Sequence, residues 1–260
     1  MKIGFALNEV LALLALATGL LSLAWWRLRR GGRRDKPWWA HWGADFFAVV
    51  MLIFTCRVAL ADWQRVPTSS MEPTLRIGDL LLINHLAYGP RLPFTNTALP
   101  TGRPQRGDIF VFRYPPDVSQ FYVKRVMGIA GDRVQFRDGG VAINGEPLRL
   151  RDIGWGEHEA DLGTRLVRET SAGHEHTVKI NPFVLGRLPL TIGEPHCRSE
   201  RPGAWECTVP PDHLLALGDN RDNSADSRAW GFVPEREVYG RVDRVILNYR
   251  EGGRWWHKPS

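Results

Sequence analysis

The sequence predicts two N-terminal transmembrane α-helices followed by a mainly β exoplasmic domain with an inserted smaller β subdomain. Three observations support this fold class. Two apolar segments lie within the first 61 residues, short apolar stretches separated by Gly and Pro follow them, and hydrophobic density falls between residues 148 and 211. Short apolar stretches bounded by turn residues are typical of strands.

The first apolar segment is the stronger of the two predicted membrane helices. Residues 10–26 form a run of seventeen residues without a charge, and residues 5–7 can extend it. This length is near the lower limit for a helix that spans a bilayer. Only Lys2 precedes the run, whereas a cleavable signal peptide carries its positive charge before the apolar part. We therefore interpret the segment as a retained anchor.

The second apolar segment, residues 46–61, is interrupted only by Arg57, which is close enough to its end to reach the headgroups. A buried helical hairpin in a soluble protein is the alternative. The flanking charges and a cluster of tryptophans favour the membrane, because tryptophan is enriched at membrane interfaces; these are Trp25, Trp26, Trp38, Trp39 and Trp42.

The basic residues predict the topology. The chain has a formal net charge of +6, and residues 27–36 contain six basic residues and one acid, which leaves about +1 for the rest. A basic groove for nucleic acid is therefore not predicted. By the positive-inside rule this loop is cytoplasmic, and both the N-terminus and everything after about residue 62 face outward.

The strand pattern divides the exported part. Apolar strands are predicted at residues 79–84, 108–113 and 133–136, with a hairpin through Asp138-Gly139-Gly140 to residues 141–144, and strands return at 214–217 and 241–247. The predicted units are an anchor at 1–26, a basic loop at 27–42, a second helix at 43–62, a discontinuous β core at 63–147 and 212–250, an inserted subdomain or flap at 148–211, and a tail at 251–260.

Cysteine usage fits this topology. Cys56 lies in the second apolar segment and is expected to pack as a small hydrophobe. Cys197 and Cys207 could form a disulfide in an oxidising compartment. His196 and His213 lie near them, but the spacing lacks the paired form of a structural zinc site, so no metal is predicted. His174 and His176 lie in a polar stretch and are expected to be solvated.

Ser70 and Lys124 are the candidate chemical pair. A serine hydroxyl is a poor nucleophile until a base takes its proton, and the sequence has no G-x-S-x-G elbow. A neutral lysine can be that base. Apolar neighbours of Lys124 in its predicted strand favour burial, and lowering the pKa from about 10.4 to near 8 requires roughly 3 kcal/mol. Taken singly, Ser70 could cap a turn and Lys124 could protect a sheet edge.

Three sequence blocks favour the catalytic interpretation of Ser70 and Lys124 over the structural one. SMEPTL, YVKRVMGIAGD and GDNRDNSADSRAWGFVP follow the two apolar segments in this order, and the last block is highly specific. Together they resemble bacterial type I signal peptidase, the leader peptidase family of Ser/Lys dyad serine peptidases. The resemblance covers approximately residues 65–249, although residues 148–211 contribute no motif.

The resemblance implies a role for each matching residue. Ser70 matches the nucleophile and Lys124 the general base. Ser224 matches a serine that orients the lysine amine. Thr68 stands where the best-known Gram-negative relatives have a serine that shares the oxyanion hole with the nucleophile's own N–H; threonine keeps the hydroxyl donor and adds a methyl group.

Other matching residues are implied to support the site or line the substrate pocket. The supporting residues are Asp219, Arg125, Asp226 and Arg228. The apolar lining that accepts small side chains is Met71, Leu75, Tyr122 and Val123.

The implied activity is removal of signal peptides after an Ala-x-Ala-like site through an acyl-enzyme, without a metal or organic cofactor. The implied partners are preprotein signal peptides and the lipid bilayer, with a monomeric enzyme in the bacterial cytoplasmic membrane, near the secretion translocon, and its catalytic domain on the periplasmic face. Alternatives are a conjugation-type or repressor-type Ser/Lys peptidase, and a non-catalytic membrane-anchored β binding module. No DNA-binding helical module precedes Ser70, which argues against the repressor type.

Overall fold

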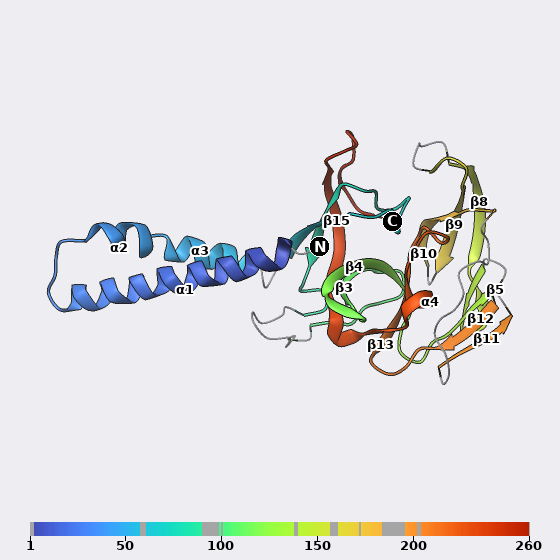
Figure 1. The fold of residues 1–260 in the computed structure, drawn as a ribbon, viewed down its shortest axis with the longest axis horizontal. Helices are drawn as coiled ribbons and strands as arrows, with labels where there is room; N and C mark the ends of the chain where they lie inside the picture. Colours follow the sequence, from blue (N-terminus) through green and yellow to red (C-terminus); the bar gives the residue numbers. More distant parts are fainter. Residues whose placement is uncertain are drawn as a thin grey trace.

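The structure is a computed structural model that describes residues 3–57, 61–89, 99, 101–137, 140–156, 161–171, 173–183, 196–201 and 204–259. It consists of a helical arm and a β domain (Figure 1). Helix α1 (Ile3–Arg30) packs against α2 (Trp38–Gly43) and α3 (Phe47–Thr55). Two stretches, Glu9–Arg30 and Trp38–Thr55, are long and apolar enough to cross a membrane by length and composition.

The helix boundaries correct the predicted ones. The basic residues Arg27, Arg29 and Arg30 lie in the last turn of α1, where cations complement the helix dipole. The second apolar stretch begins at Trp38 rather than residue 43. It ends at Thr55, and Ala61 and Asp62, which the prediction included, belong to strand β1 (Ala61–Arg65).

Arg57 also differs from its predicted position. Its side chain is buried instead of reaching toward headgroups, and its Nη2 lies 2.7 Å from Oδ1 of Asp62. The guanidinium also stacks over the ring of Trp63. A buried cation requires such a counter-charge, so this ion pair joins the end of the helical arm to the first strand of the β domain.

Among the described residues, the largest sheet has eight strands, and every pairing in it is antiparallel. Its order is β1-β2-β15-β3-β4-β13-β14, and β16 pairs with β15. The strands other than β1 are β2 (Asp79–Asn84), β3 (Ile109–Tyr114), β4 (Asp117–Gly128), β13 (His213–Leu217), β14 (Val233–Pro234), β15 (Val238–Asn248) and β16 (Trp255–His257). The short helix α4 (Ser227–Trp230) and the 3-10 turn η3 (Glu235–Glu237) connect β13 to β15.

The large sheet is buried on both faces. On β3, Ile109 and Val111 pack into one hydrophobic cluster, whereas Phe110 and Phe112 pack into another. Alternate residues of a strand point to opposite faces, so a continuous apolar strand needs cover on both sides. Strands from both ends of the exported sequence meet in this one sheet, which places the chemistry-bearing blocks beside each other.

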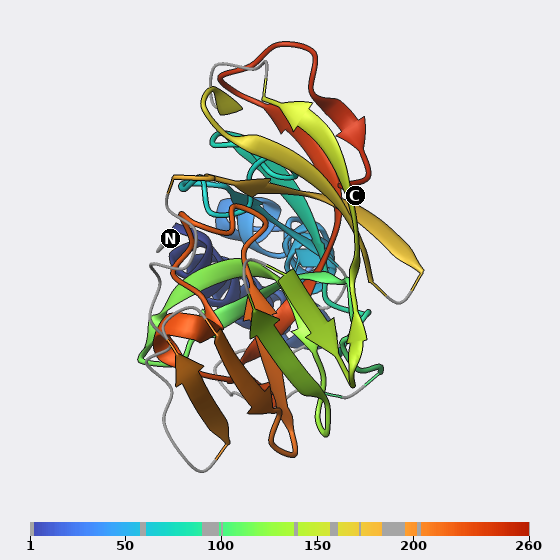
Figure 2. The ribbon, with the colours of Figure 1, turned by 90° about the vertical axis from the view of Figure 1, so that its right-hand side faces the viewer.

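Two smaller sheets contain the remaining strands. One has the order β10-β9-β8 and the other β11-β12-β5-β6-β7; they occupy different parts of the face shown in Figure 2. Their strands are β5 (Arg133–Arg137), β6 (Gly140–Ile143), β7 (Glu146–Pro147), β8 (Arg149–Trp155), β9 (Arg165–Ser171), β10 (His174–Ile180), β11 (Cys197–Arg201) and β12 (Ala204–Thr208).

The segment 148–211 is divided between these two sheets, because β8, β9 and β10 form one of them, whereas β11 and β12 belong to the other. Strands β11 and β12 pair through β12 with β5, which lies in the part predicted as core. Trp205 of β12 stacks on Phe136 of β5, with ring centroids 5.4 Å apart. A disulfide joins Cys197 and Cys207 across β11 and β12. Burial of these aromatic and sulfur side chains needs the β5 surface, which explains the shared sheet.

Candidate active site

Ser70 lies in the turn that connects β1 to β2. Within this turn the Glu72 N–H donates to the Ser69 carbonyl at 3.0 Å, and the Leu75 N–H donates to the Met71 carbonyl at 2.9 Å. Met71 and Leu75 are buried in the hydrophobic cluster beneath the turn. Their burial anchors the turn, while Ser70 itself stays partly exposed.

Lys124 reaches Ser70 from strand β4, which pairs with β3 and β13. Its Nζ donates hydrogen bonds to Ser70 Oγ at 2.6 Å and to the Val123 carbonyl at 3.1 Å. The lysine is only 3% exposed. Strand β4 pairs Lys124 with Phe110 of β3, so the central position of β4 in the sheet buries this side chain. The structure thus brings together two residues that are 54 positions apart in the sequence.

Burial changes the acidity of this lysine. Desolvation lowers the pKa of Lys124 from 10.5 to about 8, and nearby Arg228 acts in the same direction, whereas Asp226 and Asp219 oppose the shift. Loss of hydration disfavours the ammonium more than the neutral amine. With this pKa, roughly a tenth of the amine is neutral at pH 7. The arrangement can therefore supply a base next to a hydroxyl.

The block 218–228 carries two buried ion pairs beside the lysine. Arg125 donates through Nε and Nη2 to the Asp219 carboxylate at 2.9 and 2.7 Å, and Thr74 Oγ1 donates to the same group at 2.6 Å. Arg228 pairs with Asp226 at 2.7 Å. Bidentate pairs of this kind hold both side chains in one geometry. They surround Lys124 without contacting the Ser70 hydroxyl.

Strands β9 and β10, which contribute no motif, add a further buried network. Glu169 of β9 accepts hydrogen bonds from Arg221 at 2.7 and 2.8 Å. Burial of Glu169 opposes its ionisation, but Arg221 and His176 outweigh this effect and lower its pKa to about 2. The Lys179 ammonium of β10 donates to Glu72 at 2.9 Å and to Asp161 at 3.1 Å. Sequence reasoning missed these residues, because charged side chains in a polar stretch look the same whether they are solvated or paired.

The expectation that both histidines of β10 are solvated is half wrong. His174 is exposed, but His176 is 2% exposed, and its Nε2 lies 3.3 Å from Oε1 of Glu169. Burial and the charge of Arg125 lower the pKa of His176. The two side chains lie on the same face of β10, because they are two residues apart, but His174 begins the strand and is exposed, whereas His176 lies further along and is enclosed with Glu169.

Two further predicted residues, Thr68 and Ser224, belong to the surroundings of Ser70 and Lys124. Thr68 Oγ1 lies 3.4 Å from Ser70 Oγ on the exposed side. Ser224 is buried beside the Asp226 carboxylate, and the hydrogen bonds of the Lys124 amine go to Ser70 Oγ and the Val123 carbonyl rather than to Ser224. Ser224 Oγ instead lies against Gly218, where an added Cβ would be 2.2 Å from it.

A cleft of about 330 Å³ opens at Ser70. Among the predicted pocket residues, Met71, Tyr122 and Val123 line it, whereas Leu75 is 0% exposed and belongs to the cluster beneath. Leu75 therefore supports the cleft floor and does not meet a ligand. The other lining residues are Val66, Pro67, Thr68, Ser69, Ser70, Gln120, Phe121, Lys124, Asn223 and Ala225.

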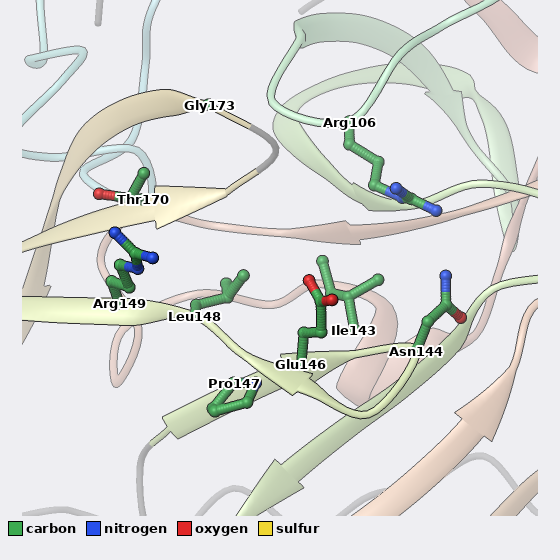
Figure 3. A pocket seen from close by; sticks show the side chains of 9 residues that line it. All are labelled: Arg106, Ile143, Asn144, Glu146, Pro147, Leu148, Arg149, Thr170 and Gly173. Atoms are coloured by element: carbon green, nitrogen blue, oxygen red, sulfur yellow. The ribbon is translucent and has the colours of Figure 1, made fainter.

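A larger pocket of about 560 Å³ lies away from Ser70, between the β6–β7 turn and the β9–β10 hairpin (Figure 3). Two of its polar side chains are already engaged by one carboxylate. Arg106 Nε donates to Asp132 at 2.6 Å, and Asn144 Nδ2 donates to Asp132 at 3.0 Å. None of its lining residues belongs to the Ser70 and Lys124 site.

Comparisons with known proteins agree on one family. The family model described as signal peptidase, peptidase S26, matches residues 39–247. Signal peptidase I of Pseudomonas aeruginosa is 34% identical over 227 residues, which cover 82% of this chain and 74% of that protein. Signal peptidase I of Aquifex aeolicus is 30% identical over 216 residues, which cover 76% of this chain and 80% of that protein.

A crystal structure of a signal peptidase I from Enterococcus faecalis V583 overlaps with a TM-score of 0.32 at 28% identity, over 54% of this chain and 97% of that chain. This overlap is too weak to support an inference. The family model, by contrast, matches most of the chain, and the relatives cover most of it as well. The chain therefore belongs to the signal peptidase family, peptidase S26.

Proposed function

We propose that this protein is a membrane-bound endopeptidase that removes signal peptides from exported preproteins, with Ser70 as nucleophile and Lys124 as general base. The observation that carries the proposal is the 2.6 Å contact between Lys124 Nζ and Ser70 Oγ at a lysine whose pKa is lowered to about 8. The relatives from Pseudomonas aeruginosa and Aquifex aeolicus are named signal peptidase I.

The reaction begins with the neutral lysine. The Lys124 amine accepts the proton of the Ser70 hydroxyl while Oγ attacks the carbonyl carbon of the cleaved bond. The Ser70 N–H and the Thr68 hydroxyl stabilise the oxyanion that forms. Lys124 then gives the proton to the leaving amine, and an acyl-enzyme ester remains on Ser70. Lys124 next takes a proton from the water that attacks the ester, and it returns this proton to Ser70 Oγ as the ester bond breaks and the acid product leaves.

The cleft supports a preference for small side chains before the cleaved bond. Met71, Tyr122 and Val123 offer a shallow apolar surface next to the nucleophile. A narrow apolar pocket rejects larger side chains by overpacking, which would give an Ala-x-Ala preference. The substrate binds as an extended strand aligned by main-chain hydrogen bonds.

The helical arm supplies the membrane anchor in this proposal. The stretches Glu9–Arg30 and Trp38–Thr55 cross the cytoplasmic membrane, residues 31–37 face the cytoplasm, and the β domain faces the periplasm. The signal peptide is itself apolar and lies in the same bilayer. Confinement to one membrane raises the effective concentration of substrate at the cleft.

The test is cleavage of a preprotein whose signal ends in Ala-x-Ala by the purified full-length protein in detergent. Wild type, Ser70→Ala and Lys124→Ala are compared with Ser119→Ala and Lys258→Ala, which alter a serine on an exposed part of β4 and an exposed C-terminal lysine. We expect cleavage at that bond by wild type and both control variants, and none by the two site variants.

Two other results would point elsewhere. Folded wild type that leaves the preprotein intact but whose Ser70 reacts with a serine-directed probe would indicate a specialised maturation peptidase. Folded wild type that neither cleaves nor reacts would indicate a binding module.

A further inference from the structure

The loop after β13 holds the main chain on both sides of the nucleophile. Asn220 is 5% exposed and contacts the Ser70 turn through two groups. Its backbone N–H donates to the Ser70 carbonyl at 3.1 Å, and its side-chain Nδ2 donates to the Ser69 carbonyl at 3.1 Å. Asn223 Nδ2 adds a contact of 3.2 Å to the Ser69 hydroxyl.

The Ser69 contact constrains the Ser70 N–H. The Ser69 carbonyl and the Ser70 N–H belong to one planar trans peptide unit, so they point in opposite directions. The carbonyl accepts hydrogen bonds from both Asn220 Nδ2 and the Glu72 N–H. These two donors fix one side of the unit. Among the described residues, the Ser70 N–H on the other side has no acceptor, and Ser70 lines the cleft.

Asn220 acts from a rigid base. The residues before and after Asn220 both form backbone hydrogen bonds to Lys179 of strand β10. The Lys179 N–H donates to the Asp219 carbonyl at 2.8 Å, and the Arg221 N–H donates to the Lys179 carbonyl at 2.9 Å. The backbone of Asn220 therefore cannot shift without breaking these bonds. Asn220 itself is absent from the residues that line the cleft, so a substrate does not touch it.

We propose that Asn220 is a positioning residue for the Ser70 N–H. Its side-chain amide donates to the Ser69 carbonyl and thereby fixes the orientation of the peptide unit whose N–H points toward the oxyanion. The inference rests on the proposed function, because it concerns the acyl-transfer step of the same site. An oxyanion donor acts through its fixed orientation toward the charge that develops in the transition state. Loss of the Asn220 amide leaves only the Glu72 N–H on the Ser69 carbonyl, so the peptide unit can tilt.

The experiment uses the full-length protein in detergent and two variants, Asn220→Ala and Asn220→Leu, of which the second keeps the branched side-chain shape and the number of heavy atoms but has no donor. The matched control is Asn248→Ala, because Asn248 Nδ2 also donates to a carbonyl, that of Ile77 at 3.2 Å, but away from the cleft. The measurements are kcat and KM for the preprotein, the melting temperature, and affinity for two peptide analogues.

The two analogues separate orientation from simple binding. A peptide aldehyde adds reversibly to Ser70: the Oγ–carbon bond forms, and the former carbonyl oxygen takes the oxyanion position with the serine proton shared between it and Lys124. A reduced-bond peptide, with CH2–NH in place of the amide, has no such oxygen. An orientation defect weakens only the aldehyde, whereas general loosening of the cleft weakens both.

We expect kcat to fall roughly 10- to 100-fold in both Asn220 variants with KM within about twofold of wild type. Aldehyde affinity falls in proportion to kcat/KM, the reduced-bond peptide binds as before, and Asn248→Ala keeps wild-type kcat.

Three results would overturn the inference when wild type is active. The Asn220 variants could have the same kcat as wild type, they could lose affinity for both analogues to the same extent, or both could fail to fold. Wild type that leaves the preprotein uncut contradicts the proposed function itself, and the inference falls with it.

Discussion

The amine of Lys124 lies 2.6 Å from the hydroxyl oxygen of Ser70, although Lys124 belongs to strand β4 and Ser70 to the turn between β1 and β2. Because strand β4 is internal to the large sheet, the lysine that makes this contact is almost completely buried. The same burial that lowers its pKa makes it available as a base. The burial of Lys124 and its lowered pKa therefore have one structural cause, the position of β4 inside the sheet.

Activity should follow the neutral fraction of Lys124. Its pKa of about 8 means that the base is mostly protonated below pH 8. We expect kcat/KM to rise about tenfold per pH unit below that value and to level off above it. Lys124→Arg keeps the positive charge but cannot lose its proton, so it should be inactive at every pH. A flat pH profile between pH 6 and 8 would contradict the role of Lys124.

Removal of the buried ammonium should stabilise the protein. The pKa of Lys124 is 10.5 in the unfolded reference and about 8 when folded. Below pH 8 the lysine is charged in both states, and the folded state bears the full cost of burying that charge. This cost is about 3 kcal/mol and disappears as pH rises from 8 to 10.5. We expect Lys124→Met to raise the free energy of unfolding by up to that amount at pH 7.

Urea unfolding of wild type and Lys124→Met at pH 7 and pH 10.5 tests this expectation. Lys258→Met is the control, since that lysine is exposed. A Lys124→Met variant less stable than wild type at pH 7 would show that the contacts of the amine outweigh its desolvation.

Gly218 should tolerate no larger side chain. A Cβ at this position would lie 2.2 Å from Ser224 Oγ and 2.4 Å from the Ser70 carbonyl oxygen. The second neighbour is a backbone atom of Ser70 and can move only with that residue. We expect Gly218→Ala to lower kcat by at least about 100-fold and to cost about 1–3 kcal/mol of stability. Gly252→Ala, where a Cβ would meet nothing within 4 Å, should match wild type in both measurements.

The buried pair of Glu169 and Arg221 should contribute strongly to stability. Both side chains are at most 3% exposed, so Glu169→Gln leaves a buried guanidinium without its counter-charge. We expect a loss of about 3–5 kcal/mol at pH 7, measured by urea unfolding. Glu206→Gln should cost less, since Glu206 pairs with the exposed Arg133.

The same pair gives a pH signature. The pKa of Glu169 is 4.5 in the unfolded reference and about 2 when folded. Its contribution is therefore fully present above pH 4.5 and is lost as pH falls toward 2. The difference in stability between wild type and Glu169→Gln should shrink over this interval. A constant difference from pH 6 to pH 2.5 would show that the carboxylate charge is not what stabilises the pair.

The local patterns in the sequence were sufficient for the main elements. Strands at residues 79–84, 133–137 and 213–217 follow from short apolar runs bounded by Gly, Pro or polar residues, and the first apolar helix follows from its length. The family follows from three motif blocks and is confirmed by the family model. These features depend on residues close together in the chain, which is why a single sequence shows them.

Only the tertiary structure decided which polar groups are buried and with which partners. Arg57 pairs with Asp62, His176 is enclosed with Glu169, and Leu75 packs beneath the cleft. The hydrogen bond from Asn220 to Ser69 joins residues 151 positions apart. A charged or amide side chain has the same appearance in a sequence whether it is solvated or paired. Its environment is determined by strands that meet only when the sheet forms, because desolvation and partner geometry are properties of the assembled fold.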